Sequence, residues 1–225
     1  MKFLIAIAAM LAAAPSLAVP TPVAVRVLSQ GAKFIGDGMG GVEVTLVDVA
    51  TGKTLKQGKA IGGTGDTVRI MNGAPRGERL ATEGVATFAT MIDIAEPTEI
   101  RLTVNGPLKP AGTAVSLTTT RWLIPGQPIA GDGWVVELPG LALTARREGG
   151  RVIADVSMLC GCPIAPGSLW DAKRFRIDAW VGDKRVPLAY AGQTGRFAGD
   201  VPAGATWVTA LDALSGASSA VRLTP

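Results

Sequence analysis

Hydrophobic and polar residues alternate in short runs along most of this chain, and glycine, proline and aspartate separate the runs. Val42–Val47 and Glu99–Val104 alternate strictly, with the period of two residues that is typical of a half-buried β-strand. A helical repeat of apolar residues is nearly absent. Further strands are expected at residues 23–28, 53–55, 85–94, 115–123, 134–138, 152–158, 175–181, 186–190, 207–211 and 220–223. The pattern therefore predicts an all-β chain of the sandwich type.

Two stretches near the middle of the chain resist regular structure, Pro125–Pro128 and Gly131–Gly133. We predict a linker there, with one β-sandwich domain at residues 19–127 and a second at residues 131–225. Each domain would hold about 100 residues, which is a common domain size. On this interpretation Trp134–Leu138 is the opening strand of the second domain.

Two segments resemble known modules. GVEVTLVDVATGK (residues 41–53) resembles the strand-turn-strand of transthyretin-like, carboxypeptidase-regulatory-like modules. WVTALDALSG (residues 207–216) is similar to the last hairpin of bacterial immunoglobulin-like domains. The resemblance implies two tandem immunoglobulin-like β-sandwich domains, a fold that carries adhesion, binding and scaffold roles rather than one chemistry.

The N-terminus has the pattern of a secretory signal peptide. Lys2 precedes an apolar run, Phe3–Ala14, and small residues follow at Ser16 and Ala18. The run is shorter than the roughly 20 residues of a membrane-spanning helix, and no later stretch reaches that length without charges or glycines. We expect a signal peptide at residues 1–18, no integral membrane span, and a mature periplasmic or secreted protein.

Composition and charge exclude several function classes. The chain has 225 residues, of which 48% are hydrophobic and none is histidine. Without histidine there can be no Ser-His-Asp or Cys-His catalytic machinery and no histidine-ligated zinc or copper. The formal net charge is +4, one unit of which comes from Lys2, and acids and bases are interspersed. That distribution argues against a nucleic-acid partner. For an exported protein, we expect the partner to be another exported protein or a cell-envelope component.

Both cysteines of the chain lie in Cys160-Gly161-Cys162, with Met158 two residues before them. In an extended strand these three sulfurs would share one face, and sulfur ligands alone suit Cu(I). An oxidising compartment would instead permit a Cys160–Cys162 disulfide. The Cα atoms would lie about 6.6 Å apart in a strand, at the far edge of the roughly 4.4–6.8 Å disulfide range. A disulfide therefore needs a turn at Gly161; a redox-active pair and buried free thiols are the other possibilities.

The five tryptophans fall into two groups. Trp170 and Asp171 follow the loop Pro163–Ser168, close to the cysteines, where they could line a binding surface. The other four lie in apolar strand-like segments, which predicts packing in a core or between domains. These are Trp122, Trp134, Trp180 and Trp207.

Two glycine-rich segments look like nucleotide-binding motifs on paper. Gly36–Gly41 satisfies G-x-G-x-x-G, but a strand follows instead of the helix that would hold a pyrophosphate. Gly62–Asp66 lacks the Lys-Ser/Thr ending of a phosphate-binding loop. We interpret the first as a turn and the second as part of a long flexible loop, and expect no cofactor.

The favoured function is non-catalytic: an exported binding or scaffold protein that engages a partner through loops 62–77 and 158–171. The alternative is a thiol-based function, either Cu(I) binding by Met158, Cys160 and Cys162 or disulfide exchange by the two cysteines. A hydrolase is the third hypothesis, although no pair is selected among the scattered aspartates Asp48, Asp93, Asp155, Asp178 and Asp212. Exposure of the cysteine sulfurs to solvent would distinguish the first two hypotheses.

Overall fold

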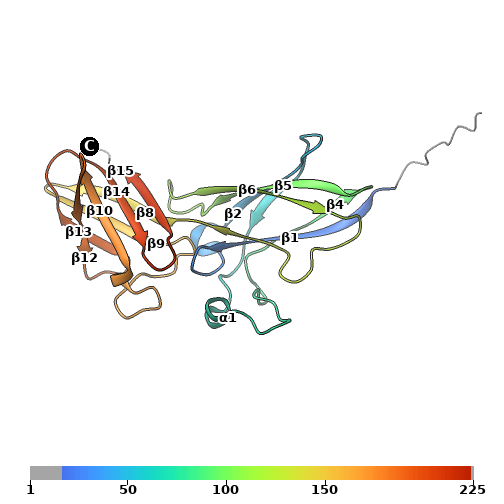
Figure 1. The fold of residues 1–225 in the computed structure, drawn as a ribbon, viewed down its shortest axis with the longest axis horizontal. Helices are drawn as coiled ribbons and strands as arrows, with labels where there is room; N and C mark the ends of the chain where they lie inside the picture. The colour runs from blue at the N-terminus through green and yellow to red at the C-terminus, as the bar shows by residue number, and fades with distance from the viewer. Residues whose placement is uncertain (1–16, 224–225) are drawn as a thin grey trace, which may run out of the picture.

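A computed structural model describes residues 17–223, and this part of the chain forms two β-sandwiches along its long axis (Figure 1). The prediction of an all-β chain with two tandem sandwiches is therefore confirmed. The predicted signal peptide lies almost wholly outside the described residues. Within residues 17–223, no helix has both the length and the apolar character needed to cross a membrane.

The first sandwich pairs a three-stranded sheet, ordered β4-β1-β7, with a four-stranded sheet, ordered β3-β2-β5-β6. All neighbours are antiparallel except β1 and β7, which are parallel. Its strands are β1 (Val19–Ser29), β2 (Val42–Asp48), β3 (Thr54–Ala60), β4 (Phe88–Ile94), β5 (Thr98–Gly106), β6 (Val115–Leu123) and β7 (Trp134–Leu138).

The second sandwich pairs two antiparallel four-stranded sheets, ordered β11-β10-β14-β15 and β12-β13-β9-β8. Its strands are β8 (Leu141–Glu148), β9 (Arg151–Met158), β10 (Phe175–Val181), β11 (Lys184–Pro187), β12 (Ala189–Tyr190), β13 (Arg196–Asp200), β14 (Ala205–Asp212) and β15 (Ser218–Arg222). Short 3-10 turns, η1 (Asp37–Met39) and η2 (Ala172–Arg174), and one short helix, α1 (Thr67–Asn72), lie between strands.

Alternation along the strands creates a separate core in each sandwich. In β2, Val42, Val44 and Leu46 are fully buried while Glu43 is exposed. Burying such side chains removes about 25 cal/mol of unfavourable hydration per Å² of apolar surface, which is the main driving force for each sandwich. Each core therefore follows from the period-two pattern of the sequence.

The strand Trp134–Leu138 belongs to the first sandwich, not to the second as its position in the sequence suggested. As β7 it pairs in parallel with the C-terminal half of β1, with Val25 opposite Trp134 and Ser29 opposite Leu138. The expected linker before it is anchored to the same sandwich: the carboxylate of Asp132 accepts hydrogen bonds from the backbone N–H groups of Leu80 and Ala81, both at 2.9 Å. Residues 125–133 thus cross between the two sheets of the first sandwich, and the chain passes from the first sandwich to the second only between β7 and β8.

A turn at the end of β1, residues 29–33, joins the two sandwiches. Ala32 of this turn is buried in the second core, and Leu159, just after β9, is buried in the first. The Leu159 N–H donates to Ser29 Oγ at 3.1 Å, and Gln30 Nε2 donates to the carbonyl of Ser215 at 2.9 Å. Exchanged core residues and hydrogen bonds in both directions make this junction a fixed contact rather than a flexible tether.

The glycine-rich stretch 62–77, expected as a flexible loop, contains α1. The Asp66 carboxylate caps it by accepting a hydrogen bond from the Arg69 N–H at 2.7 Å, and the Arg69 side chain pairs with Glu78. Met71 of this helix packs against the core of the second sandwich. The segment projects from the first sandwich near the junction (Figure 1).

Candidate functional site

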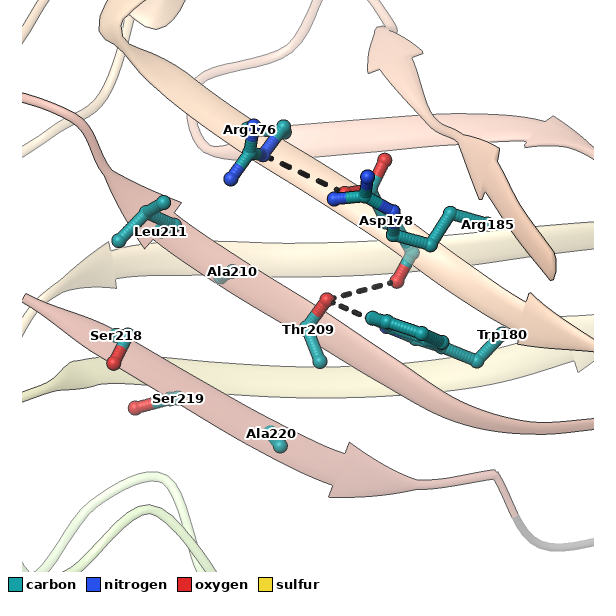
Figure 2. Close-up of a pocket in the computed structure, with 10 residues that line it drawn as sticks. All are labelled: Arg176, Asp178, Trp180, Arg185, Thr209, Ala210, Leu211, Ser218, Ser219 and Ala220. Atoms are coloured by element: carbon teal, nitrogen blue, oxygen red, sulfur yellow. Dashed lines mark hydrogen bonds and ion pairs between the residues drawn. The ribbon is translucent and has the colours of Figure 1, made fainter. Parts of the chain in front are cut away.

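The outer face of the β11-β10-β14-β15 sheet carries three rows of side chains that run across its strands, and Figure 2 shows those that line a hollow on this face. Directly paired residues of neighbouring strands point to the same face of a sheet, so the register defines each row. The rows are Arg185, Trp180, Trp207 and Arg222; then Pro187, Asp178, Thr209 and Ala220; then Arg176, Leu211 and Ser218. At about 4.8 Å per strand, a row from β11 to β15 spans about 14 Å.

In the first row, each arginine lies against a tryptophan. Arg185 Cζ is 5.7 Å from the ring centroid of Trp180, and Arg222 Cζ is 4.7 Å from that of Trp207. The Trp180 indole N–H donates to Thr209 Oγ1 at 2.9 Å, which fixes its ring to the sheet. A guanidinium held over a ring by cation–π attraction keeps its N–H groups free for a carboxylate.

Asp178, in the middle row, is a buried carboxylate with unused hydrogen-bonding capacity. Its side chain is 9% exposed, and the Arg176 Nε lies 3.7 Å from Oδ2, which is too long for a hydrogen bond. Within residues 17–223 this carboxylate accepts no hydrogen bond. Buried charges in proteins are normally paired and hydrogen-bonded, because desolvation is costly. The two oxygens of Asp178 are therefore available to donors on a bound molecule.

Small side chains in the middle row turn this face into a hollow of about 410 Å³. Thr209 and Ala220 line the hollow between the larger side chains Trp180, Arg185 and Leu211 of the outer rows. Figure 2 shows Arg176, Asp178 and Arg185 grouped on one side and the serines of β15 on the other. The hollow combines donor-only arginines, an acceptor-only aspartate and an aromatic ring, a set suited to holding a polar ligand.

The cysteines lie elsewhere, in a turn that follows β9. The structure joins Cys160 and Cys162 in a disulfide with Cα atoms 5.4 Å apart, and Met158 and both cysteines are buried in the second core. Copper binding by these residues stays a prediction, and it would first require reduction of the disulfide, because the metal ligand is the thiolate. Within the described residues, no three histidine, cysteine, aspartate or glutamate side chains group as a metal site.

Trp170 and Asp171, expected on a binding surface, serve the local structure. Trp170 is 5% exposed, and its indole N–H donates to the Gly31 carbonyl across the junction at 3.2 Å. The pKa of the Asp171 carboxyl is lowered by hydrogen bonds from the N–H groups of Lys173 and Gly167, both at 2.8 Å. Burial makes Trp170 mainly a packing residue, and a binding-surface role for Trp170 and Asp171 stays a prediction.

The loops 62–77 and 158–171, predicted separately as surfaces, meet beside the junction. Thr64 from the first and Cys160–Pro163 with Trp170 from the second line one hollow of about 200 Å³. That hollow is half the volume of the one on the outer sheet and contains neither an unbonded carboxylate nor a stacked arginine.

Sequence reasoning missed the outer face because it assigned the tryptophans of strands to cores. Trp134 is buried, but Trp122 and Trp207 are 60% and 38% exposed. A signal was present: Arg176, Asp178 and Trp180 occupy alternate positions, so all three must lie on the face opposite to Ile177 and Ala179.

Comparison with known proteins identifies neither a family nor a function for this chain. No protein-family model matches the chain, and no curated protein sequence matches it. Among solved structures, the chain is similar to native alpha-2-macroglobulin from Escherichia coli spanning domains NIE-MG1, with a TM-score of 0.28 and 8% identity over 93% of this chain and 99% of that one. Similarity at this level says nothing about function, so the proposals below rest on the geometry of this chain.

Proposed function

We propose that this protein is an exported, non-catalytic binding protein that holds a cell-envelope component or another exported protein on the outer face of the β11-β10-β14-β15 sheet. One observation carries the proposal: the Asp178 carboxylate is nine-tenths buried, lines an open hollow, and accepts no hydrogen bond from residues 17–223. The oxygens of this carboxylate face the hollow, where donors on a partner can form hydrogen bonds to them.

The junction supports a scaffold role for the first sandwich. Ala32 and Leu159 are exchanged between the cores, and Trp170 bonds to Gly31 across the contact. The fixed junction holds the binding face at a set distance and angle from the first sandwich, as a scaffold role requires.

Hydroxyl-radical footprinting of the full chain, with and without the envelope fraction of cells that export it, tests the proposal. Trp207 lies on the proposed face at 38% exposure, and Trp122 lies on the first sandwich at 60% exposure, so the chain contains its own control. We expect the envelope fraction to lower oxidation of Trp207 and to leave Trp122 unchanged. Equal protection of both tryptophans, or of neither, would contradict the proposal.

Variants sharpen the same measurement. Asp178→Ala and Arg185→Ala should each abolish the protection of Trp207, because each removes a polar group of the hollow. Arg121→Ala, on the exposed surface of β6 in the first sandwich, is the matched control and should leave the protection intact. Loss of protection in the control variant would show that total positive charge, not this face, drives binding.

Export is tested separately by the intact mass of the protein recovered from outside the cytoplasm. The small residues Ser16 and Ala18 predict a mature chain that begins at Val19. Recovery of a chain that retains residues 1–18 would refute the signal-peptide prediction without affecting the binding face.

A further inference from the structure

We infer that the ligand of the outer face is an acidic glycan, a sugar chain that carries carboxylates beside free hydroxyl groups. The inference rests on the proposed function and names the class of molecule that the hollow between the three rows would hold. It follows from three features of the site: the Asp178 carboxylate, which accepts no hydrogen bond within residues 17–223; the excess of arginines over carboxylates; and the position of the hollow on the face of the sheet.

The first feature is Asp178. An ionised aspartate only accepts hydrogen bonds, so its unbonded oxygens require a ligand that donates. Its side chain is 9% exposed, and the neighbouring Arg176 Nε stays 3.7 Å away. Sugar hydroxyls donate and accept, and adjacent hydroxyls can reach both oxygens of one carboxylate. Free phosphate consists mostly of acceptor oxygens and supplies fewer donors to this carboxylate than adjacent sugar hydroxyls do.

The second feature is the excess of guanidinium groups. Arg176, Arg185 and Arg222 border the face against the single carboxylate of Asp178. Arg185 and Arg222 are stacked on Trp180 and Trp207, and neither forms an ion pair within residues 17–223. A pre-positioned guanidinium binds a carboxylate through two parallel N–H donors. The charge balance of the site therefore favours an acidic sugar over a neutral one.

The third feature is position, which disfavours an acidic peptide. The hollow lies over the face of the sheet, from Arg185 of β11 to Ser218 and Ala220 of β15, so a molecule in it contacts side chains rather than the backbone groups with which a peptide extends a sheet. In a peptide made of acidic residues alone the carboxylates lie on side chains, and the donors for Asp178 would have to come from main-chain N–H groups. A uronic acid unit carries its carboxylate and its hydroxyl donors on one ring, which fits Arg185 and Asp178 together.

Isothermal titration calorimetry of the full chain with defined probes tests this inference. Oligogalacturonate and oligomannuronate are the acidic glycans, the methyl ester of oligogalacturonate is the same chain without its charge, and oligoglutamate is the acidic peptide. We expect at least one acidic glycan to bind. The affinity for the methyl ester should be lower than that for the acidic glycan by about tenfold or more, and the affinity for oligoglutamate should be lower still.

The sign of the Asp178→Ala effect separates a built site from simple charge attraction. If positive charge alone held the glycan, removing a negative charge would tighten binding. If sugar hydroxyls donate to Asp178, the same change weakens binding by about tenfold or more. Arg185→Lys keeps the positive charge but cannot form a bidentate pair of hydrogen bonds with a carboxylate, so it should also weaken binding. Arg121→Ala on the first sandwich should leave the affinity unchanged.

Three results would overturn the inference: neither acidic glycan binds, oligoglutamate binds as tightly, or Asp178→Ala binds more tightly. Folding of each variant is checked by its urea transition, so that an unfolded variant is not mistaken for a non-binding one. Footprinting distinguishes the two proposals. If the envelope fraction protects Trp207 and the glycans do not bind, the face binds another class of partner; if neither has an effect, both proposals fail.

Discussion

Asp212 and Asp178 are both buried aspartates of the same sheet, on neighbouring strands, yet their surroundings are opposite. Asp212, at the end of β14, accepts hydrogen bonds from Arg174 Nε at 2.8 Å, from Ser215 Oγ at 2.6 Å and from the Leu214 N–H at 3.1 Å. Burial alone would raise the pKa of Asp212, but these bonds, led by that from Arg174, more than offset it, and the pKa is lowered. Asp178, on the outer face, accepts none within residues 17–223.

The difference separates a structural charge from an available one. The bonds of Asp212 fix the turn between β14 and β15, and the carbonyl of Ser215 in that turn accepts the hydrogen bond from Gln30 at the junction. The carboxylate oxygens of Asp212 accept hydrogen bonds from within the fold, and through the turn they fix they also stabilise the contact between the sandwiches. The carboxylate oxygens of Asp178 accept no hydrogen bond within residues 17–223 and face the hollow, so they contribute little to the stability of the fold.

Asp212→Ala is expected to have the largest effect on stability. It would leave Arg174, whose side chain is 16% exposed, without its carboxylate partner. Breaking a buried ion pair from one side costs about 3–5 kcal/mol. Urea denaturation should show that loss, with tryptophan fluorescence as the probe. A loss below about 1 kcal/mol would mean that Asp212 is no more structural than an exposed residue, since exposed pairs contribute about that much at most.

Gly31→Ala probes the other side of the junction. Gly31 has φ +65°, and a Cβ placed there would lie 2.5 Å from the Cβ of Ser215. Positive φ and steric overlap together should cost about 3 kcal/mol of unfolding free energy. Gly52→Ala is the matched control, because Gly52 has φ +70° with nothing within 4 Å, and should cost about 1 kcal/mol. Equal losses for the two variants would show that the sandwiches do not press together at this point.

Acid should weaken the fold through the bonded aspartates. Burial raises the pKa of Asp155, but Arg196 and Arg146 outweigh it, so the pKa of Asp155 is lowered, as is that of Asp212. A carboxyl with a lowered folded-state pKa stabilises the protein above its unfolded pKa, near 3.9 for aspartate, and loses that contribution as pH falls through the folded pKa. Unfolding free energy should be flat above about pH 5 and fall below about pH 4. Asp155→Asn should reduce this fall; an increase in stability on acidification would contradict both assignments.

The cysteine pair should matter less. One residue separates Cys160 from Cys162, so the closed ring constrains the unfolded chain very little. Replacing both with alanine deletes two buried sulfurs, and we expect a loss of about 1–2 kcal/mol with ligand binding unchanged. A thermal melt of the double variant and calorimetry with the acidic glycans check the two parts. Loss of glycan binding in a folded double variant would point back to a functional role for the cysteines.

Much of the fold could be predicted from the sequence, because period-two alternation reports local environment directly. The segments around Val44 and Leu102 form β2 and β5, close to where the pattern placed them. Alternation does not show which strands pair in a sheet, and so Trp134–Leu138 was assigned to the wrong sandwich. Its partner is β1, more than 100 residues earlier, and only tertiary packing determines that pairing.

The candidate site was less predictable for the same reason. Trp180 and Trp207 are 27 residues apart in sequence and become neighbours only through the register of β10 with β14. The polar face of β10 could be derived from Arg176 and Asp178 at alternate positions. The sequence alone does not show that Asp178 is buried and accepts no hydrogen bond within residues 17–223, because side chains from three other strands bury it.

Asp178→Ala should have the smallest effect on stability, and it is the sharpest test of the comparison. Because the carboxylate accepts no hydrogen bond within residues 17–223, its removal breaks only the 3.7 Å ion pair with Arg176 and removes a largely buried charge. Arg176, its ion-pair partner, is 60% exposed and stays hydrated. We therefore expect a change in unfolding free energy within about 0.5 kcal/mol of zero, or a small gain. Urea transitions of wild type, Asp178→Ala and Asp212→Ala measure the contrast. Equal losses of unfolding free energy in the two variants would contradict the distinction between the aspartates. A stable Asp178→Ala variant that no longer binds glycan would place the Asp178 carboxylate at the binding site.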